Sequence, residues 1–358
     1  MRTTVNKPRS HMISLEHEAP SDLRHYYAQM LLLRRFEERT SEMYVKAKIG
    51  GYCHLNLGEE ATIVGLNAAL TPDDYVFTNY REHGYILARG ADPKRVMAEL
   101  FGKETGVSGG RGGSMHLFDA ERHFMGGYAI VGGQVPLAVG AAYALKYQGR
   151  PGVVIAQMGD ATTNIGAFYE SLNLAKLWQL PVIFFIVNNG YGMGTAVERG
   201  SSEPNLAKKG ASFRIHGERV DGTDVIAVRD AVRRLRQKAE QDHEPAILDV
   251  VSFRFRGHSV IDADRYRDAG AVRRGREKFD PITSFATRLL DQQIADQAFL
   301  DTTAQQIDAE VQAAIDFATT SPDPQAADLY TFMYATPVAN TPAADDALRA
   351  VRINRGEE

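Results

Sequence analysis

The chain alternates between short, mostly apolar runs and longer segments in which apolar residues recur at helical spacing. The runs lie at residues 153–158, 182–187 and 246–253, and the longer segments between them at 164–178 and 223–239. Continuous apolar runs of this length are typical of strands that are buried on both faces. Strands separated by helices predict a mostly parallel central sheet flanked by helices, which is the α/β class.

Helical spacing also occurs outside this central region. Ser21 can cap a long first helix whose apolar pattern ends at the Gly50-Gly51 pair. The same pattern predicts shorter helices at residues 59–70, 92–101, 134–147, 282–290 and 304–317.

These elements define one expected domain, residues 21–335, with a helical C-terminal part. Residues 1–20 lack the apolar centre of a secretory signal, so we interpret them as a flexible lead-in. Residues 336–358 are expected to form a poorly ordered tail. The longest strongly apolar run, 180–187, is much shorter than the roughly 20 residues of a membrane-spanning helix, which argues against a membrane protein.

Composition narrows the function classes. With 41 basic and 45 acidic side chains, the formal net charge is -4, which disfavours nucleic acid and anionic lipid as partners. Cys53 is the single cysteine, so the chain forms no internal disulfide and no zinc site of four thiolates. A reducing cytoplasm is the expected compartment.

Residues 102–133 are unusually rich in glycine, but large apolar residues such as Met115, Phe118 and Phe124 interrupt the stretch. A flexible linker would not carry these side chains. We therefore expect a packed loop that brings the backbone close to a ligand.

The chemistry is indicated where two predicted strands end. Gly159-Asp160-Ala161 follows the first, and Asn188-Asn189-Gly190-Tyr191 follows the next. The carboxyl ends of parallel strands share one edge of a sheet, where ligands of open α/β folds bind. A carboxylate, an amide oxygen and a backbone carbonyl form an all-oxygen set that suits magnesium.

A Gly-Asp pair followed by paired asparagines is also the pattern of thiamine diphosphate enzymes, although Ala161 stands where that pattern usually has a second glycine. Further motifs accompany it in the chain: Gly-Gly-Ser-Met-His-Leu at 112–117, Ile-Val-Gly-Gly-Gln-Val-Pro-Leu at 130–137, Tyr-Gly-Met-Gly-Thr at 191–195, Arg-Val-Asp-Gly-Thr-Asp at 219–224 and Arg-Gly-His-Ser at 256–259. Over roughly residues 20–335, the sequence resembles the alpha subunits of pyruvate dehydrogenase and related 2-oxo acid dehydrogenases.

The resemblance implies a thiamine-diphosphate-binding fold and a set of cofactor contacts. Asp160, Asn189 and the carbonyl of Tyr191 match the magnesium ligands, and Tyr80 and Arg81 match the pair that reaches the diphosphate. An arginine fork suits phosphate oxygens.

Other positions match the remainder of the cofactor. Ala161 and Thr162 fall beside the diphosphate, and Val131 matches the backbone group that hydrogen-bonds the aminopyrimidine. Ala129 stands where relatives commonly have glycine.

Three histidines match positions that face the reacting centre: His54, His83 and His258. An imidazole can stabilise a developing oxyanion, orient a substrate carboxylate or exchange protons near neutral pH. The motif context favours a catalytic role for His54 and His258 most strongly, and His258 is also expected to contact the cofactor.

The resemblance implies two protein partners. The carboxylate that activates the aminopyrimidine has no obvious match here, because Glu59 and Glu60 stand at a helix start and are assigned to capping and the helix dipole. A separate beta subunit would complete the site, in a heterotetramer with two copies of each subunit. Residues 134–145 are a candidate contact between subunits.

The second partner is the lipoyl domain of a dihydrolipoyl acyltransferase. The resemblance implies that residues 258–278 form a mobile loop, which orders over the cofactor and receives the lipoyl arm. Ser259 lies where mitochondrial relatives are phosphorylated.

Several alternatives stay open at this stage. The motifs favour a pyruvate-type 2-oxo acid substrate, while acetoin-cleaving and branched-chain relatives share most of them. A nucleotide-binding module is disfavoured because no Gly-x-Gly-x-x-Gly follows a predicted strand and no P-loop is present. An inactive scaffold subunit is disfavoured because Asp160, Asn189 and His258 are retained.

Overall fold

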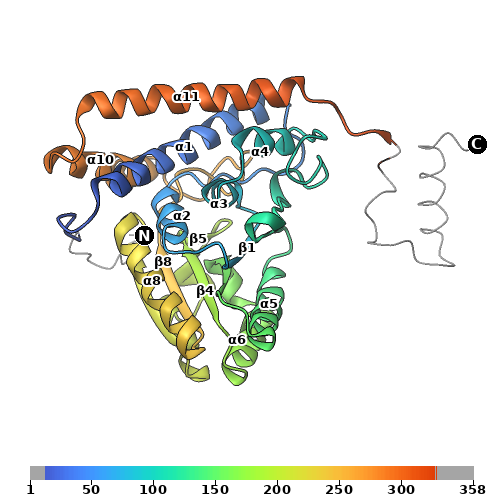
Figure 1. Ribbon diagram of the computed structural model, residues 1–358, viewed down its shortest axis with the longest axis vertical. Coiled ribbons are helices and arrows are strands. Elements are labelled where there is room, and N and C mark those ends of the chain that lie inside the picture. Colours follow the sequence, from blue (N-terminus) through green and yellow to red (C-terminus); the bar gives the residue numbers. More distant parts are fainter. Residues whose placement is uncertain (1–12, 327, 329–358) are drawn as a thin grey trace, which may run out of the picture.

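A six-stranded parallel sheet forms the centre of the computed structural model, which describes residues 13–326 and 328 (Figure 1). The strand order is β2-β1-β3-β4-β8-β7, and each neighbouring pair is parallel. Their bounds are β1 Tyr75–Asn79, β2 Phe124–Tyr128, β3 Val154–Gly159, β4 Val182–Asn188, β7 His216–Asp221 and β8 Ala246–Val251. A small antiparallel pair, β5 Tyr191–Gly192 and β6 Thr195–Ala196, follows β4. The predicted α/β class with a parallel central sheet is confirmed.

The central strands are mostly apolar, with Gln157 on β3 and Asp249 on β8 as buried exceptions, because both of their faces are covered. On β4, Val182, Phe184 and Ile186 join one hydrophobic cluster, whereas the alternate residues Ile183, Phe185 and Val187 join another. Side chains on a strand point alternately to opposite faces, so a continuous apolar run supplies two cores at once.

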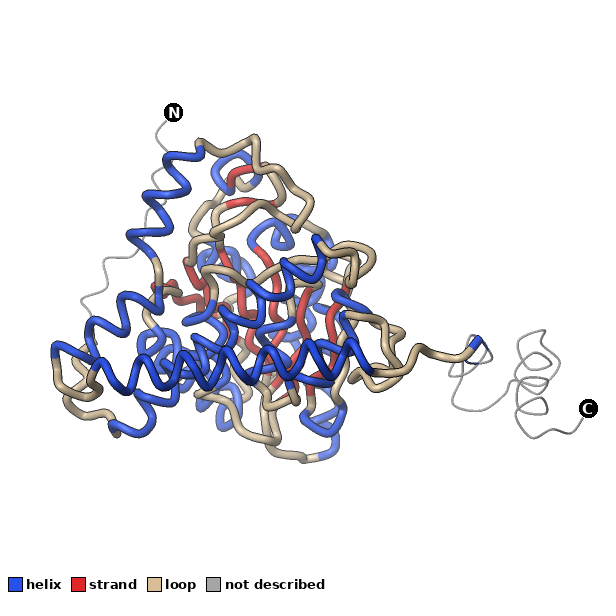
Figure 2. Tube along the Cα trace, turned by 90° about the horizontal axis from the view of Figure 1, so that it is seen from above, coloured by secondary structure: helices blue, strands red, loops and turns tan. Residues whose placement is uncertain are grey.

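Helices form a layer on each face of the sheet (Figures 1 and 2). One core contains side chains of α5 Gln134–Gln148 and α6 Gly166–Leu177. The other contains side chains of α2 Glu60–Asn67 and α8 Val225–Asp242. Outside α2 lie the long helices α1 Pro20–Val45 and α11 Gln297–Thr320, which pack side by side, together with α4 Pro93–Leu100 and α10 Pro281–Asp291.

The remaining helices are short or lie near the ends of the strands. They are α3 His83–Ala88, α7 Val197–Gly200 and α9 Ala269–Phe279. Single turns of 3-10 helix lie at Gly113–Met115 and Ala120–Arg122, and longer ones at Asp160–Asn164 and Leu206–Phe213. In the described part of the chain, every helix is too short or too polar to cross a bilayer.

Most predicted elements are confirmed, and the differences have local causes. The first helix starts at Pro20 with Ala19 as its N-cap, so Ser21 is not the cap, and it ends at Val45 before the glycine pair. The edge strands β2 and β7 carry the sequences Phe-Met-Gly-Gly-Tyr and His-Gly-Glu-Arg-Val-Asp, which lack an apolar run. Helix α9 occupies part of the expected mobile loop, because Asp268 caps it by accepting from the Ala271 amide.

The end of the expected lead-in is packed against the domain. Leu15 is only 2% exposed, and the Glu18 carboxylate pairs with Arg229 of α8. These contacts tie residues directly before α1 to the core. The predicted tail, 336–358, lies outside the described residues.

A buried carboxylate organises the glycine-rich loop. Glu99, at 0% exposure on α4, accepts four backbone N–H groups from the loop, at 2.7 to 3.1 Å. Two of the donors are Gly110 and Gly112, and a Cβ atom at Gly112 would lie 1.9 Å from the His116 carbonyl oxygen. The loop is therefore packed, as predicted, and it needs glycine where the backbone turns back on itself.

We predict that Phe184→Ala lowers the free energy of unfolding by about 3–5 kcal/mol, because it leaves a cavity between the sheet and α6. Urea denaturation of the purified chain measures this change. Val45→Ala is the control, since Val45 is 78% exposed and its truncation is expected to change stability by less than about 0.5 kcal/mol. Equal losses in the two variants would contradict the two-core packing.

Candidate active site

Four parallel strands bring polar residues to one edge of the sheet. Strands β1, β3 and β4 each end directly before a predicted site residue, and β8 ends a few residues before the last of them. These residues are Tyr80 and Arg81 after β1, Asp160 after β3, Asn189 after β4, and Arg254 and His258 after β8. Residues far apart in the sequence therefore share one edge, as the parallel arrangement predicts.

Two oxygen atoms at this edge are buried without a hydrogen-bond partner. The Asp160 side chain is 5% exposed, and its Oδ1 accepts the Ala161 amide at 2.7 Å, but Oδ2 has no partner. The Oδ1 atom of Asn189 is likewise buried and unpaired. Unsatisfied buried acceptors are costly and uncommon, and each calls for an explanation. A carboxylate and an amide oxygen left free together fit a hard cation such as magnesium.

Burial also affects the ionisation of Asp160. It raises the pKa of this side chain to about 6, because the ionised carboxylate loses contact with water. The nearby Arg254 acts in the opposite direction and favours the ionised form. A bound cation would favour the carboxylate further, so the residues present fit a divalent metal.

Arg254 is a site residue that the sequence analysis missed. It is 2% exposed, and it donates from Nη1 to the carbonyl of Tyr191 at 3.1 Å and from Nη2 to the carbonyl of Met193 at 2.9 Å. The Tyr191 carbonyl is the third predicted metal ligand. Arg254 therefore contacts the predicted metal site directly. Burial lowers the pKa of Arg254 from its ordinary value, with Arg81 adding repulsion. Its place shortly after β8, in Ser-Phe-Arg-Phe-Arg-Gly-His-Ser, was the available signal.

The predicted diphosphate pair lies on the other side of β3. Arg81 is 6% exposed and donates to the carbonyls of Leu55, at 2.5 Å, and His258, at 2.8 Å. The positive charge of Arg81 contributes to the lowered pKa of Arg254, so the two guanidinium groups act on the same region. Two buried cations make this edge of the sheet suitable for an anionic group.

His54, Tyr80 and His258 form a compact cluster. The ring centroids of His54 lie 4.4 Å from Tyr80 and 4.9 Å from His258, and the Tyr80 hydroxyl is 3.4 Å from Nε2 of His258. The Nδ1 atoms of both histidines are buried without a partner. Burial and the Arg81 charge lower the pKa of His54 to about 2 and that of His258 to about 4. Both imidazoles are therefore neutral at pH 7.

His83 is placed differently from the other two histidines. It is fully buried, with Nδ1 2.9 Å from the Glu37 carboxylate and Nε2 2.8 Å from the Ser114 hydroxyl. Both ring nitrogens are engaged by the protein, so the structure does not leave this side chain open to a reacting group. It links α1 and α3 to the glycine-rich loop.

The predicted pyrimidine contacts lie on the turn before α5. Val131 is 46% exposed, and Ala129 lies two residues earlier on the same turn. A Cβ atom at Gly132 would lie 1.9 Å from Ile165 and 3.3 Å from Thr162. The turn is thus packed against the segment that follows Asp160, where Thr162 is buried and Ala161 exposed.

Glu59 has a role that the sequence analysis did not predict. It occupies the N-cap position of α2, but its side chain makes no capping hydrogen bond. Instead the carboxylate accepts from Nδ2 of Asn189 at 2.9 Å and from Nδ2 of Asn56 at 3.1 Å. Glu60 differs as well, since its carboxylate pairs with Arg34 in addition to accepting the Gly58 amide. The assignment of both residues to capping is corrected.

The segment after His258 is folded over the cluster. The Asp262 carboxylate accepts from the His258 amide and the Tyr266 hydroxyl, both at 2.6 Å. Arg267 pairs with Asp264 and donates to the Arg254 carbonyl at 2.7 Å. The expected loop thus has a defined hydrogen-bonded conformation ahead of α9.

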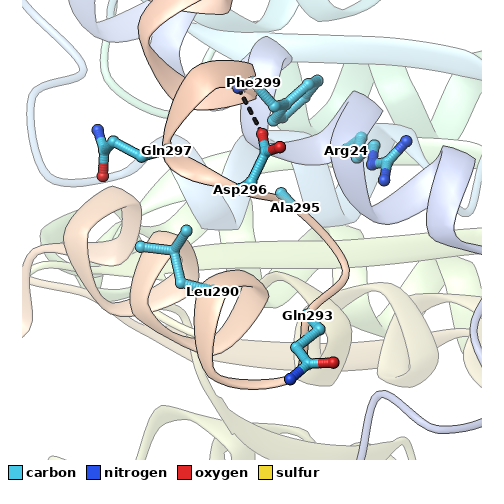
Figure 3. Close-up of a pocket in the computed structure, with 7 residues that line it drawn as sticks. All are labelled: Arg24, Leu290, Gln293, Ala295, Asp296, Gln297 and Phe299. Carbon is cyan, nitrogen blue, oxygen red and sulfur yellow. Dashed lines mark hydrogen bonds between the residues drawn. The ribbon is translucent and has the colours of Figure 1, made fainter.

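A separate pocket of about 600 Å³ lies at the turn between α10 and α11 (Figure 3). Arg24, Asp296 and Phe299 help to line it, and the Asp296 carboxylate caps α11 through the Phe299 amide. None of the predicted site residues lines this pocket. The chemistry is therefore assigned to the sheet edge.

Comparison with known proteins places the chain in a family. Residues 28–327 match the family described as Dehydrogenase E1 component, and the chain belongs to this family. The family depends on thiamine diphosphate.

The curated relatives include three similar alpha subunits. Pyruvate dehydrogenase E1 component subunit alpha of Rhizobium meliloti (strain 1021) is 45% identical over 309 residues, which cover 85% of this chain and 88% of the relative. The subunit of the same name from Zymomonas mobilis subsp. mobilis is 45% identical over 316 residues, covering 88% and 89%. That of Rickettsia bellii is 42% identical over 308 residues, covering 86% and 94%.

We predict that the buried histidines make the fold less stable as the pH falls from about 6.5 towards 4. In that window the unfolded chain protonates at its ordinary histidine pKa, whereas the lowered pKa values of His54 and His258 keep the folded state neutral. The double variant His54→Gln/His258→Gln should therefore show a smaller loss. Urea denaturation at pH 7 and pH 5 measures the difference. His216→Gln, on the surface, should behave as the wild type, and a double variant with the wild-type slope would refute the prediction.

Proposed function

We propose that this chain is the alpha subunit of a pyruvate dehydrogenase and holds the magnesium diphosphate end of thiamine diphosphate. The carrying observation is the pair of buried, unpartnered oxygens, Oδ2 of Asp160 and Oδ1 of Asn189, at the carboxyl edge of the sheet. Membership of the E1 family and the names of its relatives support the assignment.

Asp160, Asn189 and the Tyr191 carbonyl would hold the magnesium ion. Magnesium takes oxygen ligands in octahedral geometry and is commonly bound by few protein groups together with phosphate oxygens and water. Tyr80, Arg81, Ala161 and Thr162 would lie along the diphosphate, and the turn carrying Ala129 and Val131 would meet the aminopyrimidine. Arg254 adds a second guanidinium for the phosphate charge.

The cofactor supplies the electron sink for decarboxylation of the 2-oxo acid, and the protein supplies position and charge. His54 and His258 are neutral at pH 7 and each keeps a buried, unpaired Nδ1 atom. A neutral imidazole can donate a hydrogen bond to developing negative charge or pass a proton. We assign these roles to His54 and His258. His83 is assigned to positioning the glycine-rich loop, because Glu37 and Ser114 engage its ring nitrogens.

The partners follow from a group that the site lacks among the described residues of this chain, a free carboxylate for the aminopyrimidine. Both carboxylate oxygens of Glu59 already accept hydrogen bonds from asparagines, so Glu59 is not the free carboxylate that an aminopyrimidine requires. A beta subunit would supply that group, in a heterotetramer of two alpha and two beta chains. The lipoyl domain of a dihydrolipoyl acyltransferase would receive the acyl group, and the compartment would be the cytoplasm.

We predict that Asp160→Ala and His258→Ala separate binding from turnover. Asp160→Ala should abolish magnesium-dependent binding of thiamine diphosphate, because it removes an anionic ligand, whereas His258→Ala should retain binding and slow turnover by roughly 10²–10⁴-fold. Calorimetric titration of the complex with its partner subunit, together with steady-state rates, tests both. The same loss of binding in the two variants would show that the roles are misassigned.

We predict that the complex oxidises pyruvate by decarboxylation with a higher kcat/KM than it shows for the decarboxylation of branched-chain 2-oxo acids or for the cleavage of acetoin, since the relatives compared above are pyruvate dehydrogenase subunits. Reduction of an artificial electron acceptor measures the rates with each substrate. Wild-type complex lacking added thiamine diphosphate is the control. A preference for acetoin or a branched-chain acid would overturn the substrate assignment while leaving the cofactor assignment in place.

A further inference from the structure

Glu59 lies at the predicted metal site without belonging to the predicted ligand set. It is 1% exposed, and a tight turn at Gly58 leads into it. A Cβ atom at Gly58, whose φ is +97°, would lie 2.1 Å from the Phe253 carbonyl oxygen, so the turn requires glycine. The backbone therefore holds Glu59 against the segment that follows β8, with its carboxylate directed to Asn189.

The contact between Glu59 and Asn189 determines how the amide is turned. An asparagine amide presents an oxygen on one side and an NH2 group on the other, and the two are nearly equal in size. Both carboxylate oxygens of Glu59 act as acceptors, one from Asn189 and one from Asn56, so the side chain selects the orientation in which Nδ2 of Asn189 faces it, at 2.9 Å. The Oδ1 atom of Asn189 is then directed away from Glu59, and it is the buried oxygen that lacks a partner.

Glu59 is itself held in place. Its other carboxylate oxygen accepts from Nδ2 of Asn56 at 3.1 Å, and Oδ1 of Asn56 accepts the Gly84 amide at 3.0 Å. The Asn56 amide nitrogen of the main chain donates to Glu37 at 2.8 Å. This buried network fixes the carboxylate, and an oriented acceptor can fix the group that it binds.

We propose that Glu59 is a positioning residue that turns the Asn189 amide oxygen towards the magnesium ion. The proposal rests on the magnesium site of the proposed function and adds a residue that acts through a ligand. Loss of a residue that hydrogen-bonds to a metal ligand typically weakens the affinity for the metal, or the activity, 10–100-fold. Glu59 acts because both of its carboxylate oxygens accept hydrogen bonds, so the side chain presents no donor to Asn189.

Two conservative variants test this need for two acceptor oxygens. Glu59→Gln keeps the length of the side chain, but its amide offers one oxygen to the two NH2 groups of Asn56 and Asn189. Because the Gly84 amide fixes Asn56, the introduced NH2 group is expected to face Asn189 and to favour the flipped amide. Glu59→Asp keeps two acceptor oxygens and the charge, but it withdraws them by one methylene group. The proposal expects each variant to weaken the apparent Kd for magnesium roughly 10–100-fold.

The measurement is calorimetric titration of Mg²⁺ into the metal-free complex with its partner subunit, at saturating thiamine diphosphate. At saturating Mg²⁺, kcat of Glu59→Asp should approach the wild-type value, since the defect lies in binding. Glu60→Gln is the matched control, because Glu60 pairs with Arg34 and not with Asn189. It should lower the melting temperature and leave the Kd for magnesium unchanged.

The outcomes distinguish this inference from the proposed function. A wild-type complex that does not bind Mg²⁺ with thiamine diphosphate would overturn the proposed function, and the role of Glu59 with it. If the wild type binds but Glu59→Asp binds equally well, only the positioning role fails. A Glu59→Gln variant with the wild-type Kd would show that an acceptor-only side chain is not needed beside Asn189, and it would likewise overturn the inference.

Discussion

Everything at the site depends on two buried oxygen atoms that the protein leaves without a hydrogen bond. Burying an unpaired carboxylate oxygen at Asp160 and an unpaired amide oxygen at Asn189 opposes folding, and the fold tolerates it at the carboxyl edge of its sheet. The cost is spread over a large apolar structure, since the strands that carry these residues contribute to cores on both faces. Stability is thus concentrated in the middle of the sheet and function at its edge.

The surroundings of these oxygens are arranged by contacts at several levels. Glu59 orients Asn189, Arg254 meets the Tyr191 carbonyl, and Arg81 anchors the backbone beside His258. The imidazoles of His54 and His258 are neutral beside these charged residues, because burial and the Arg81 guanidinium lower their pKa. The same dry environment therefore raises the pKa of the carboxyl group and lowers that of the imidazoles.

The sequence predicts the central part of this structure well, because the strands β3, β4 and β8 are mostly apolar runs separated by regular helices. Three strands escape prediction. β1 is an apolar run of only five residues, and the edge strands β2 and β7 carry glycine or charged residues in place of an apolar run. Motifs likewise place Asp160, Asn189 and His258 at one edge. They do not reveal Glu59, whose contact with Asn189 spans 130 residues and exists only once the sheet has formed. They also do not show that His83 is enclosed, since its partners Glu37 and Ser114 come from distant segments.

The buried carboxylate of Glu99 determines the shape of the glycine-rich loop. Four main-chain amides of the loop donate to this one side chain of α4. The outer surface of the loop is thus set by a residue that a molecule bound to that surface would not contact. A molecule that docks on this surface finds the backbone already immobilised, and association does not have to suppress its motion. Because Glu99 belongs to α4, a displacement of this helix would also change the shape of the loop.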